Sequence, residues 1–357
     1  MNRKNICEIC TLIMGQSPDS KSYNKDKNGI PFYQGNADFG EEHPTPTVWC
    51  TAPKKIARKG DILISVRAPI GDMNIANEDC CIGRGLAAIR LNKSDIVDIN
   101  YLYHYLSATV EFLQEQGTGS TFKAINKTTL EGIEIPCPSI EKQKNIAKLI
   151  IEIKTSIQYK KAELFALNEL VKSRFIEMFG DIRISSIFPN IALENFAQIG
   201  SSKRVHAADY VESGVPFYRS KEIIELGNGQ EPSVELFISK KQYESIKKTN
   251  GVPCKGDILM SAVGTIGKMW IVDGRKDFYY KDGNIISIHS EETNPIYLKE
   301  ALANLIDDFK SANVAGSAYS ALTIVKLKKM TVPMPPMSIQ NEFADFVKLI
   351  DKSKFVG

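Results

Sequence analysis

The sequence contains no long run of apolar residues. No stretch approaches the roughly 18 uninterrupted apolar residues of a membrane-spanning helix, and the opening residues, MNRKNICEIC, lack the apolar core of a signal peptide. We therefore expect a cytoplasmic protein. The formal net charge is only +3 over 357 residues, so the overall charge does not by itself indicate a nucleic-acid ligand.

Residues that build metal sites and disulfide frameworks are few and scattered. The seven cysteines are odd in number and widely spaced, unlike those of a disulfide framework. Cys7 and Cys10 have the spacing of half a zinc site, but the second pair is missing, because Cys80 and Cys81 are adjacent. The four histidines are also far apart. We expect free thiols and no metal site.

Sequence motifs for catalysis are missing as well. No Asn/Asp-Pro-Pro-Tyr/Phe block is present to hold a target amine, and no glycine-rich loop follows a strand to cradle S-adenosylmethionine or a phosphate. The Gly-Thr-Gly segment at residues 117–119 follows a predicted helix instead. Asp19 and Lys21 superficially resemble part of a nuclease motif, but both fall in one turn-rich loop. We expect no catalytic residues and no cofactor.

What the sequence does contain is an internal repeat of a module of about 140 to 155 residues. Four sequence blocks recur in the same order. The blocks and their second copies are Gly29–Tyr33 and Gly214–Tyr218, Lys59–Ser65 and Lys255–Ser261, Tyr101–Leu102 and Tyr297–Leu298, and Ile135–Gln143 and Val332–Gln340. The offset between the copies is 185 residues at the first block and 196 at the second, so the second copy carries about 11 extra residues between them.

Each module is predicted to mix short strands with a few helices, which gives an α+β fold. Strands are predicted at residues 62–65, 73–76 and 86–91. Residues 99–116 have the apolar spacing of a helix, as do residues 295–310 in the second copy. Between the shared blocks the copies diverge, and we interpret the divergent segments as loops with different tasks on one scaffold.

A long helix is expected after the first module, because residues 141–179 contain neither proline nor glycine. Its apolar side chains follow the alternating four- and three-residue steps of a coiled-coil seam, with Lys160 as an interruption. The seam residues are Ile146, Ile150, Ile153, Ile157, Leu164, Leu167 and Val171. Such a helix spans roughly 58 Å, too long for one module, so we expect an antiparallel coiled coil with residues 339–355. The alternative is a solvated linker helix.

The doubled series of blocks, together with the junction at residues 175–181, resembles the specificity subunit of type I restriction–modification systems. The resemblance covers nearly the whole chain. It implies a non-catalytic protein in which each module is a target-recognition domain for double-stranded DNA. It also implies that the long helices form an antiparallel coiled coil, which sets the separation of two half-targets and docks two methyltransferase subunits. The resemblance further implies that restriction subunits bind at the outside of this complex.

On this interpretation the chain has four parts. They are target-recognition domain 1 at residues 1–140, a central helix at 141–180, target-recognition domain 2 at 181–337, and a C-terminal helix at 338–357. The offset of 197 residues at the last block would carry the counterpart of Phe179 to about residue 376, whereas the printed sequence ends at Gly357. The second helix is therefore expected to be short or truncated.

Candidate DNA-binding residues lie in the segments that differ between the copies. Lysine and arginine neutralise phosphates, while arginine and small polar side chains on loops pair with base edges. The candidates are Gln34, Asn36, Arg67, Arg84, Ser120, Thr121 and Lys123 in the first module and Arg219, Ser220, Lys221, Lys268, Ser317 and Tyr319 in the second. Lys59 and Lys255 occur in both copies, which favours a shared phosphate contact or a turn. Since the loops differ, we expect an asymmetric, bipartite target with unread bases between its halves.

Three other functions remain open at this point. A stand-alone DNA-binding protein, such as a repressor, would use the long helix to dimerise. A truncated donor allele would serve to exchange recognition modules by recombination. A nuclease or methyltransferase in its own right would need the motifs that are missing.

Overall fold

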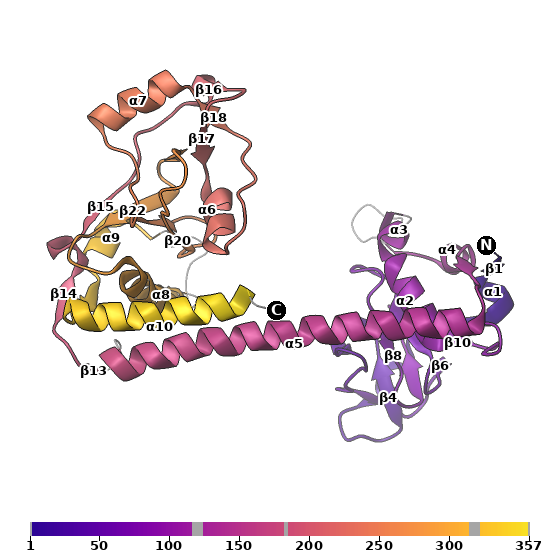
Figure 1. Ribbon diagram of the computed structural model, residues 1–357. Helices are drawn as coiled ribbons and strands as arrows, with labels where there is room; N and C mark the ends of the chain where they lie inside the picture. Colours follow the sequence, from indigo (N-terminus) through magenta and orange to yellow (C-terminus); the bar gives the residue numbers. More distant parts are fainter. Residues whose placement is uncertain (1, 116–123, 182–184, 314–321, 356–357) are drawn as a thin grey trace. The chain divides into compact units, whose positions relative to one another are not determined.

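The computed structural model describes residues 2–115, 124–181, 185–313 and 322–355. The chain divides into two compact units, unit 1 at residues 1–160 and unit 2 at residues 161–357 (Figure 1). Each unit has its own hydrophobic cores and contains one copy of the repeated module. Within the described residues, no helix is both long and apolar enough to cross a membrane. The mixed α+β fold with two repeated domains and a long helix is confirmed.

A four-stranded antiparallel sheet forms the centre of unit 1. Its order is β2 (Cys10–Met14), β10 (Leu86–Leu91), β7 (Ile62–Ser65) and β8 (Met73–Ile75). All four residues of β7 are buried, because its two faces contribute to different cores. This explains why the strand has a continuous apolar run in the sequence rather than an alternating one.

Unit 1 has a second sheet, here called the outer sheet, which contains both parallel and antiparallel pairs of strands. Its order is β3 (Tyr23–Asn24), β5 (Trp49–Cys50), β4 (Ile30–Tyr33), β9 (Cys80–Ile82) and β6 (Ile56–Ala57). The pair formed by β4 and β9 is parallel, and the other pairs are antiparallel. The shared block Gly29–Tyr33 thus supplies β4, whose C-terminal end carries Gln34 out of the sheet.

One helix of unit 1 precedes the sheets and the others follow them in the chain. These helices are α1 (Ile6–Ile9), α2 (Ile99–Ala108), α3 (Val110–Glu115) and α4 (Lys127–Glu131), with the short pair of β1 (Arg3–Asn5) and β11 (Glu134–Pro136) beside them. The prediction of one helix over residues 99–116 was wrong in one respect. Thr109 leaves the helical conformation, and its hydroxyl donates to the Leu106 carbonyl at 2.8 Å, which ends α2.

Unit 2 repeats this topology strand for strand in the central sheet. That sheet has the order β15 (Gln198–Gly200), β22 (Ile285–His289), β19 (Ile258–Ser261) and β20 (Met269–Ile271). The outer sheet of unit 2 has the order β16 (Tyr210–Val211), β18 (Phe237–Ile238), β17 (Val215–Tyr218) and β21 (Tyr279–Tyr280). The pair of β17 and β21 is again parallel. A two-stranded pair, β14 (Asn190–Ala192) with β23 (Thr331–Pro333), matches β1 with β11.

The extra residues of the second copy form helices. Among the described residues, α6 (Ser220–Gly227) directly follows β17, and α7 (Lys240–Thr249) lies between β18 and β19, where unit 1 has β6. Unit 2 also contains α8 (Pro295–Asn313) and α9 (Ile324–Lys328). In Figure 1, α7 lies at the end of unit 2 opposite to α8.

The residues of the shared blocks make the same hydrogen bonds in both units. The Tyr101 hydroxyl donates to the Pro136 carbonyl at 3.0 Å, and the Tyr297 hydroxyl donates to the Pro333 carbonyl at 2.5 Å. The fully buried Gln143 accepts from the backbone N–H of Asp98, at the start of α2. These bonds tie each helix to the block that follows it, so the shared residues are scaffold, as the sequence predicts.

A matching buried glutamine fixes the start of α8. Gln340 accepts from the Asn294 N–H at 2.8 Å and donates to the Pro335 carbonyl at 2.9 Å. It lies in α10 (Met337–Phe355), as Gln143 lies in α5 (Ile140–Phe179). A buried side-chain amide that satisfies several backbone groups cannot be replaced by an apolar residue without leaving those groups unpaired.

The two long helices begin and end close to the predicted positions. Within unit 2, α10 packs antiparallel on the C-terminal half of α5, because Phe343 contacts Phe175 and Phe179 while later residues of α10 lie beside Val171. Of the predicted seam, Val171 is buried and Leu167 partly buried in this core. Within unit 1 the seam is more open: Ile146 packs against the core, whereas Ile153 and Ile157 are 58% and 49% exposed.

Candidate nucleic-acid interface

Backbone hydrogen bonds in unit 1 join three loops at one end of the central sheet. The Gly85 N–H donates to the Gln34 carbonyl at 3.0 Å, and the Val66 N–H donates to the Gly85 carbonyl at 2.9 Å. The loops therefore bring together Gln34, Arg67 and Arg84, which are far apart in the sequence and were all predicted to contact DNA. All three are exposed. We name this group the loop site of unit 1.

Small residues allow the three loops of the loop site to approach one another closely. The Ser17 hydroxyl is 2.9 Å from Gln34 Nε2 and accepts from the Arg84 N–H at 3.3 Å. A Cβ at Gly85 would lie 2.4 Å from the Gln34 carbonyl oxygen, so only glycine permits this approach. The backbone of the loop site is thus fixed and the Gln34 amide is bonded to the Ser17 hydroxyl, while the exposed side chains of Arg67 and Arg84 remain available to a ligand.

Two further candidates of unit 1 are not part of the loop site as defined above. Asn36 donates to the Asp72 carboxylate at 2.5 Å, which occupies its amide. Lys59 is exposed, but it precedes β7, whereas Arg67 follows this strand, so the two cations lie at opposite ends of β7. Ser120, Thr121 and Lys123 are outside the described residues.

Unit 2 contains the same three loops with different side chains. The Ala262 N–H donates to the Asn284 carbonyl at 2.8 Å, and the Gly283 N–H donates to the Ser201 hydroxyl at 3.2 Å. These bonds match those of Val66 with Gly85 and of Arg84 with Ser17. At the positions of Gln34, Arg67 and Arg84, unit 2 has Arg219, Val263 and Gly283, and we name this group the loop site of unit 2. One scaffold thus presents two chemically different surfaces.

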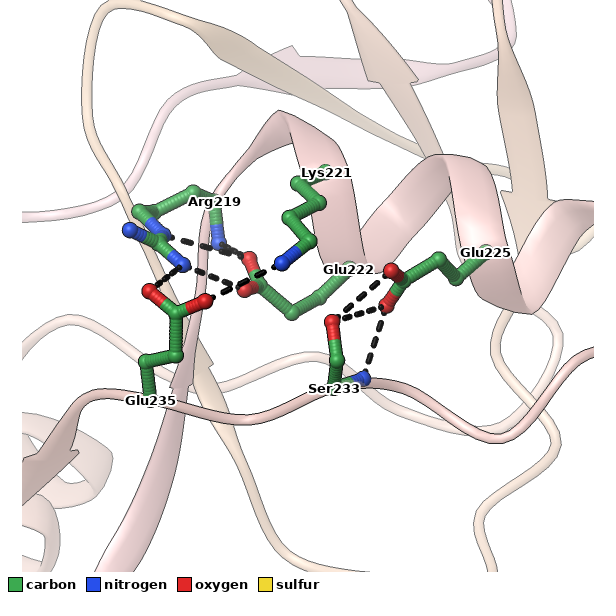
Figure 2. A network of polar contacts seen from close by, with 6 residues as sticks. All are labelled: Arg219, Lys221, Glu222, Glu225, Ser233 and Glu235. Carbon is green, nitrogen blue, oxygen red and sulfur yellow. Dashed lines mark hydrogen bonds and ion pairs between the residues drawn. The ribbon is translucent and has the colours of Figure 1, made fainter. Parts of the chain in front are cut away.

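Arg219 does not extend freely to solvent. Its Nη2 is 2.8 Å from Glu222 and 2.9 Å from Glu235, and its backbone N–H donates to Glu222 at 2.7 Å. Lys221 binds the other oxygen of Glu235 at 3.0 Å. Figure 2 shows both cations directed at carboxylates. Because the Glu222 side chain is only 1% exposed, the geometry points to a structural role for Arg219, which joins α6 to the segment before β18.

The network is completed by a second contact of α6. Glu225 accepts from both the N–H and the hydroxyl of Ser233, at 2.7 and 2.8 Å (Figure 2). The carboxylates raise the pKa of Arg219, chiefly through the hydrogen bond to Glu222. Conversely, the hydrogen bonds from Lys221 and Arg219 lower the pKa of Glu235. Sequence reasoning missed this network, because Glu235 lies 16 residues after Arg219.

The other candidates of unit 2 are spread over its surface. Ser220 is the first residue of α6 and is half-buried, and Lys268 lines a hollow beside α8 and α10. Lys255 is exposed in the turn before β19, in the position that Lys59 has in unit 1. Ser317 and Tyr319 fall outside the described residues. Of the predicted residues of unit 2, Arg219, Ser220 and Lys221 are therefore the ones that lie together.

The described residues contain no group of three or more histidine, cysteine or carboxylate side chains that could hold a metal ion. Cys7 is exposed while Cys10 is buried, so this pair does not share an environment. Burial raises the pKa of Cys10 and Cys80 to about 12. These are the properties of packed thiols rather than of reactive ones.

Comparison with known proteins gives consistent matches. The family model for the type I restriction modification DNA specificity domain matches residues 1–169 and 188–355. A putative type I restriction enzyme MjaX specificity subunit of Methanocaldococcus jannaschii is 45% identical over 177 residues, which are 49% of this chain and 41% of that protein. A putative specificity subunit of Haemophilus influenzae is 27% identical over 73% of this chain and 66% of its own length.

The matched regions span less than two thirds of these two relatives. A solved structure covers more of the chain. The type I restriction-modification S subunit from M. genitalium aligns with 99% of this chain and 90% of its own, at a TM-score of 0.60 and 15% sequence identity. At that identity the match concerns the fold alone, and it covers both repeated units.

Proposed function

Because the chain belongs to the family of type I restriction modification DNA specificity domains, we propose that it is the DNA-recognition subunit of a type I restriction–modification complex. In this role it performs no chemistry itself. Each unit is a target-recognition domain, and the two together direct methyltransferase and restriction subunits to an asymmetric, bipartite DNA target.

The observation that carries the proposal is the pair of loop sites. One backbone hydrogen bond, from Val66 to Gly85 in unit 1 and from Ala262 to Asn284 in unit 2, and one bond to a serine hydroxyl occur in both units, around different side chains. Arginine offers a bidentate fork to guanine, and glutamine offers donor and acceptor to adenine. We expect two surfaces with different donors and acceptors to prefer different bases, so the half-targets should differ.

The long helix supports the proposed partners. The part of α5 in unit 1 exposes Leu149, Ile153 and Ile157, which lie along one hollow of its surface. Exposed apolar side chains in this arrangement are typical of a helix that a partner covers. We assign this surface to the methyltransferase subunits, of which the doubled architecture accommodates two.

The test is expression of the chain in a host that lacks type I systems, with and without the methyltransferase subunit of the same system, followed by methylation sequencing of the host genome. We expect methylation at one defined motif only when both proteins are present, and co-purification of the two. Methylation by the chain alone would show an enzyme, and DNA binding without a methyltransferase partner would show a stand-alone binding protein.

A further inference from the structure

Helix α7 of unit 2 carries a set of cations that the sequence-based candidates do not include. Its outer face has four exposed lysines. They are Lys240, Lys241, Lys247 and Lys248. One acidic residue, Glu244, lies among them. Among the described residues, none of the four forms an ion pair with a carboxylate, in contrast to Arg219 and Lys221.

Unit 1 has a basic segment in the corresponding position. Residues 51–60 contain four cations and no acidic residue, and all four cations are exposed. They are Lys54, Lys55, Arg58 and Lys59. No ion pair involves them within the part of the chain that the structure describes. The two segments, 54–59 and 240–248, are here called the basic segments.

In the chain, both basic segments lie between a strand of the outer sheet, β5 or β18, and the Lys-Gly-Asp turn that precedes β7 or β19. In unit 1 the segment includes the edge strand β6, and in unit 2 it is the helix α7. The two segments thus share neither sequence nor secondary structure, and they share only their place in the fold and their charge. A ligand that is bound through its charge, without a defined pattern of hydrogen-bond donors, explains this combination. The phosphate backbone of DNA is such a ligand.

The basic segments are anchored firmly on their inner sides. In α7, Tyr243 and Ile246 are buried, and the Tyr243 hydroxyl donates to Asp277 at 3.0 Å. In unit 1, the Ile82 N–H donates to the Lys55 carbonyl at 3.0 Å, which fixes the segment on β9. The lysine side chains are therefore presented from an ordered backbone, and binding does not require the segment to fold.

The turns that follow are equally fixed. The Asp61 carboxylate accepts from the Arg58 N–H at 2.7 Å, and Asp257 accepts from the Cys254 N–H at 2.8 Å. Gly60 and Gly256 have φ of +87° and +97°, a conformation that favours glycine. The shared block thus serves as a rigid turn, in which Lys59 is the last cation of the segment in unit 1 and Lys255 adds one cation after the segment in unit 2.

We infer that the basic segments bind DNA phosphates and supply the sequence-independent part of DNA affinity, while the loop sites supply base recognition. The inference rests on the proposed function in that DNA is the ligand. It adds that the cations used for affinity are those of residues 54–59 and 240–248, and that Arg219 and Lys221 contribute little to it.

The experiment measures binding of the purified chain, alone and in complex with its methyltransferase, to a short fluorescent duplex of arbitrary sequence over a range of KCl concentrations. We expect K240Q/K241Q/K247Q/K248Q to reduce the slope of log K against log salt concentration by about 0.9 for each phosphate that is no longer neutralised. K54Q/K55Q/R58Q/K59Q should act in the same way. Arginine at the four α7 positions should restore the slope, because charge and not shape is required.

The matched control removes the same charge from exposed lysines of α5, as K142Q/K144Q/K148Q/K161Q. It should leave the slope unchanged. An equal reduction by the control would show an effect of net charge and would overturn the inference, as would unchanged slopes in both test variants. Failure of the proposed function would give a different result. The wild-type chain with its methyltransferase would then bind no target more tightly than the arbitrary duplex, independently of the salt dependence of the variants.

Discussion

Asp257 accepts a hydrogen bond from His289 at 2.7 Å, in the position where unit 1 pairs Asp61 with Arg90. Arg90 binds both carboxylate oxygens of Asp61, at 3.0 and 2.7 Å, and Asp61 is only 4% exposed. The two units therefore keep the carboxylate that holds the Lys-Gly-Asp turn and differ in its partner. A guanidinium is always charged, whereas an imidazole is charged only when protonated.

We expect the pair in unit 1 to contribute more to stability. Asp61→Asn leaves the partly buried Arg90 without its counter-charge and should lower the free energy of unfolding of unit 1 by roughly 3 kcal/mol. Asp257→Asn should cost roughly 1 kcal/mol, because a neutral hydrogen bond to His289 persists. Urea unfolding of both variants measures the difference, with the exposed Asp95→Asn as the control. Equal losses would contradict the distinction.

The buried glutamines give a second prediction. Gln143 binds the Asp98 N–H and the carbonyls of Ile96 and Pro138, at 3.0, 2.9 and 2.9 Å. Gln143→Leu leaves these groups unpaired and should destabilise unit 1 by about 3 kcal/mol. The exposed neighbour Asn145→Leu should change stability by less than about 0.5 kcal/mol. A similar small effect for both variants, measured by denaturant unfolding, would show that the glutamine does not hold α2.

Arg84 and Arg219 should behave differently although both were predicted to contact DNA. Arg84→Ala should keep the stability of unit 1 and reduce discrimination at one base pair by about 1–3 kcal/mol. Arg219→Ala should instead destabilise unit 2, because the buried Glu222 loses its partner. Target selection and thermal unfolding of each variant provide the two readouts. Loss of base discrimination in a stable Arg219→Ala variant would place that residue in base reading.

Thiol reactivity tests the interpretation of the cysteines. Cys7 and Cys254 are exposed, and Cys10, Cys80 and Cys81 are buried. Since burial raises the pKa of Cys81 to about 11 and that of Cys10 to about 12, these thiols should be protonated at neutral pH. A thiolate-specific reagent should label Cys7 and Cys254 quickly in the native protein, and Cys10, Cys80 and Cys81 only after unfolding. Rapid native labelling of Cys10, identified by mass spectrometry, would contradict the packing of this region.

Much of the fold follows from the sequence because the shared blocks are the residues with fixed structural tasks. Tyr101 and Tyr297 bind the same backbone position, and Gln143 and Gln340 hold equivalent helix starts. Residues with several buried partners tolerate few replacements, so the two copies still resemble each other there. The repeat could therefore be detected, and the strands and the long helix could be placed, without coordinates.

The side-chain partners could not be predicted in the same way. Arg219 has the position of a base-reading residue, but its guanidinium is bound by the buried Glu222 of α6 and by Glu235, which is distant in the sequence. The break at Thr109 depends on one local hydrogen bond. Apart from Lys59, the cations of the basic segments were not predicted, because the two segments share charge but no sequence.

Two units with different loop sites should read two different half-targets, and this is the central claim. The most direct test is the methylated motif of the wild-type chain with its methyltransferase, compared with the motif of the Arg84→Ala variant. We expect two unequal halves separated by unread bases, and we expect the variant to relax one half while the other stays unchanged. A single continuous or palindromic motif, or a change in both halves from this one substitution, would contradict the claim.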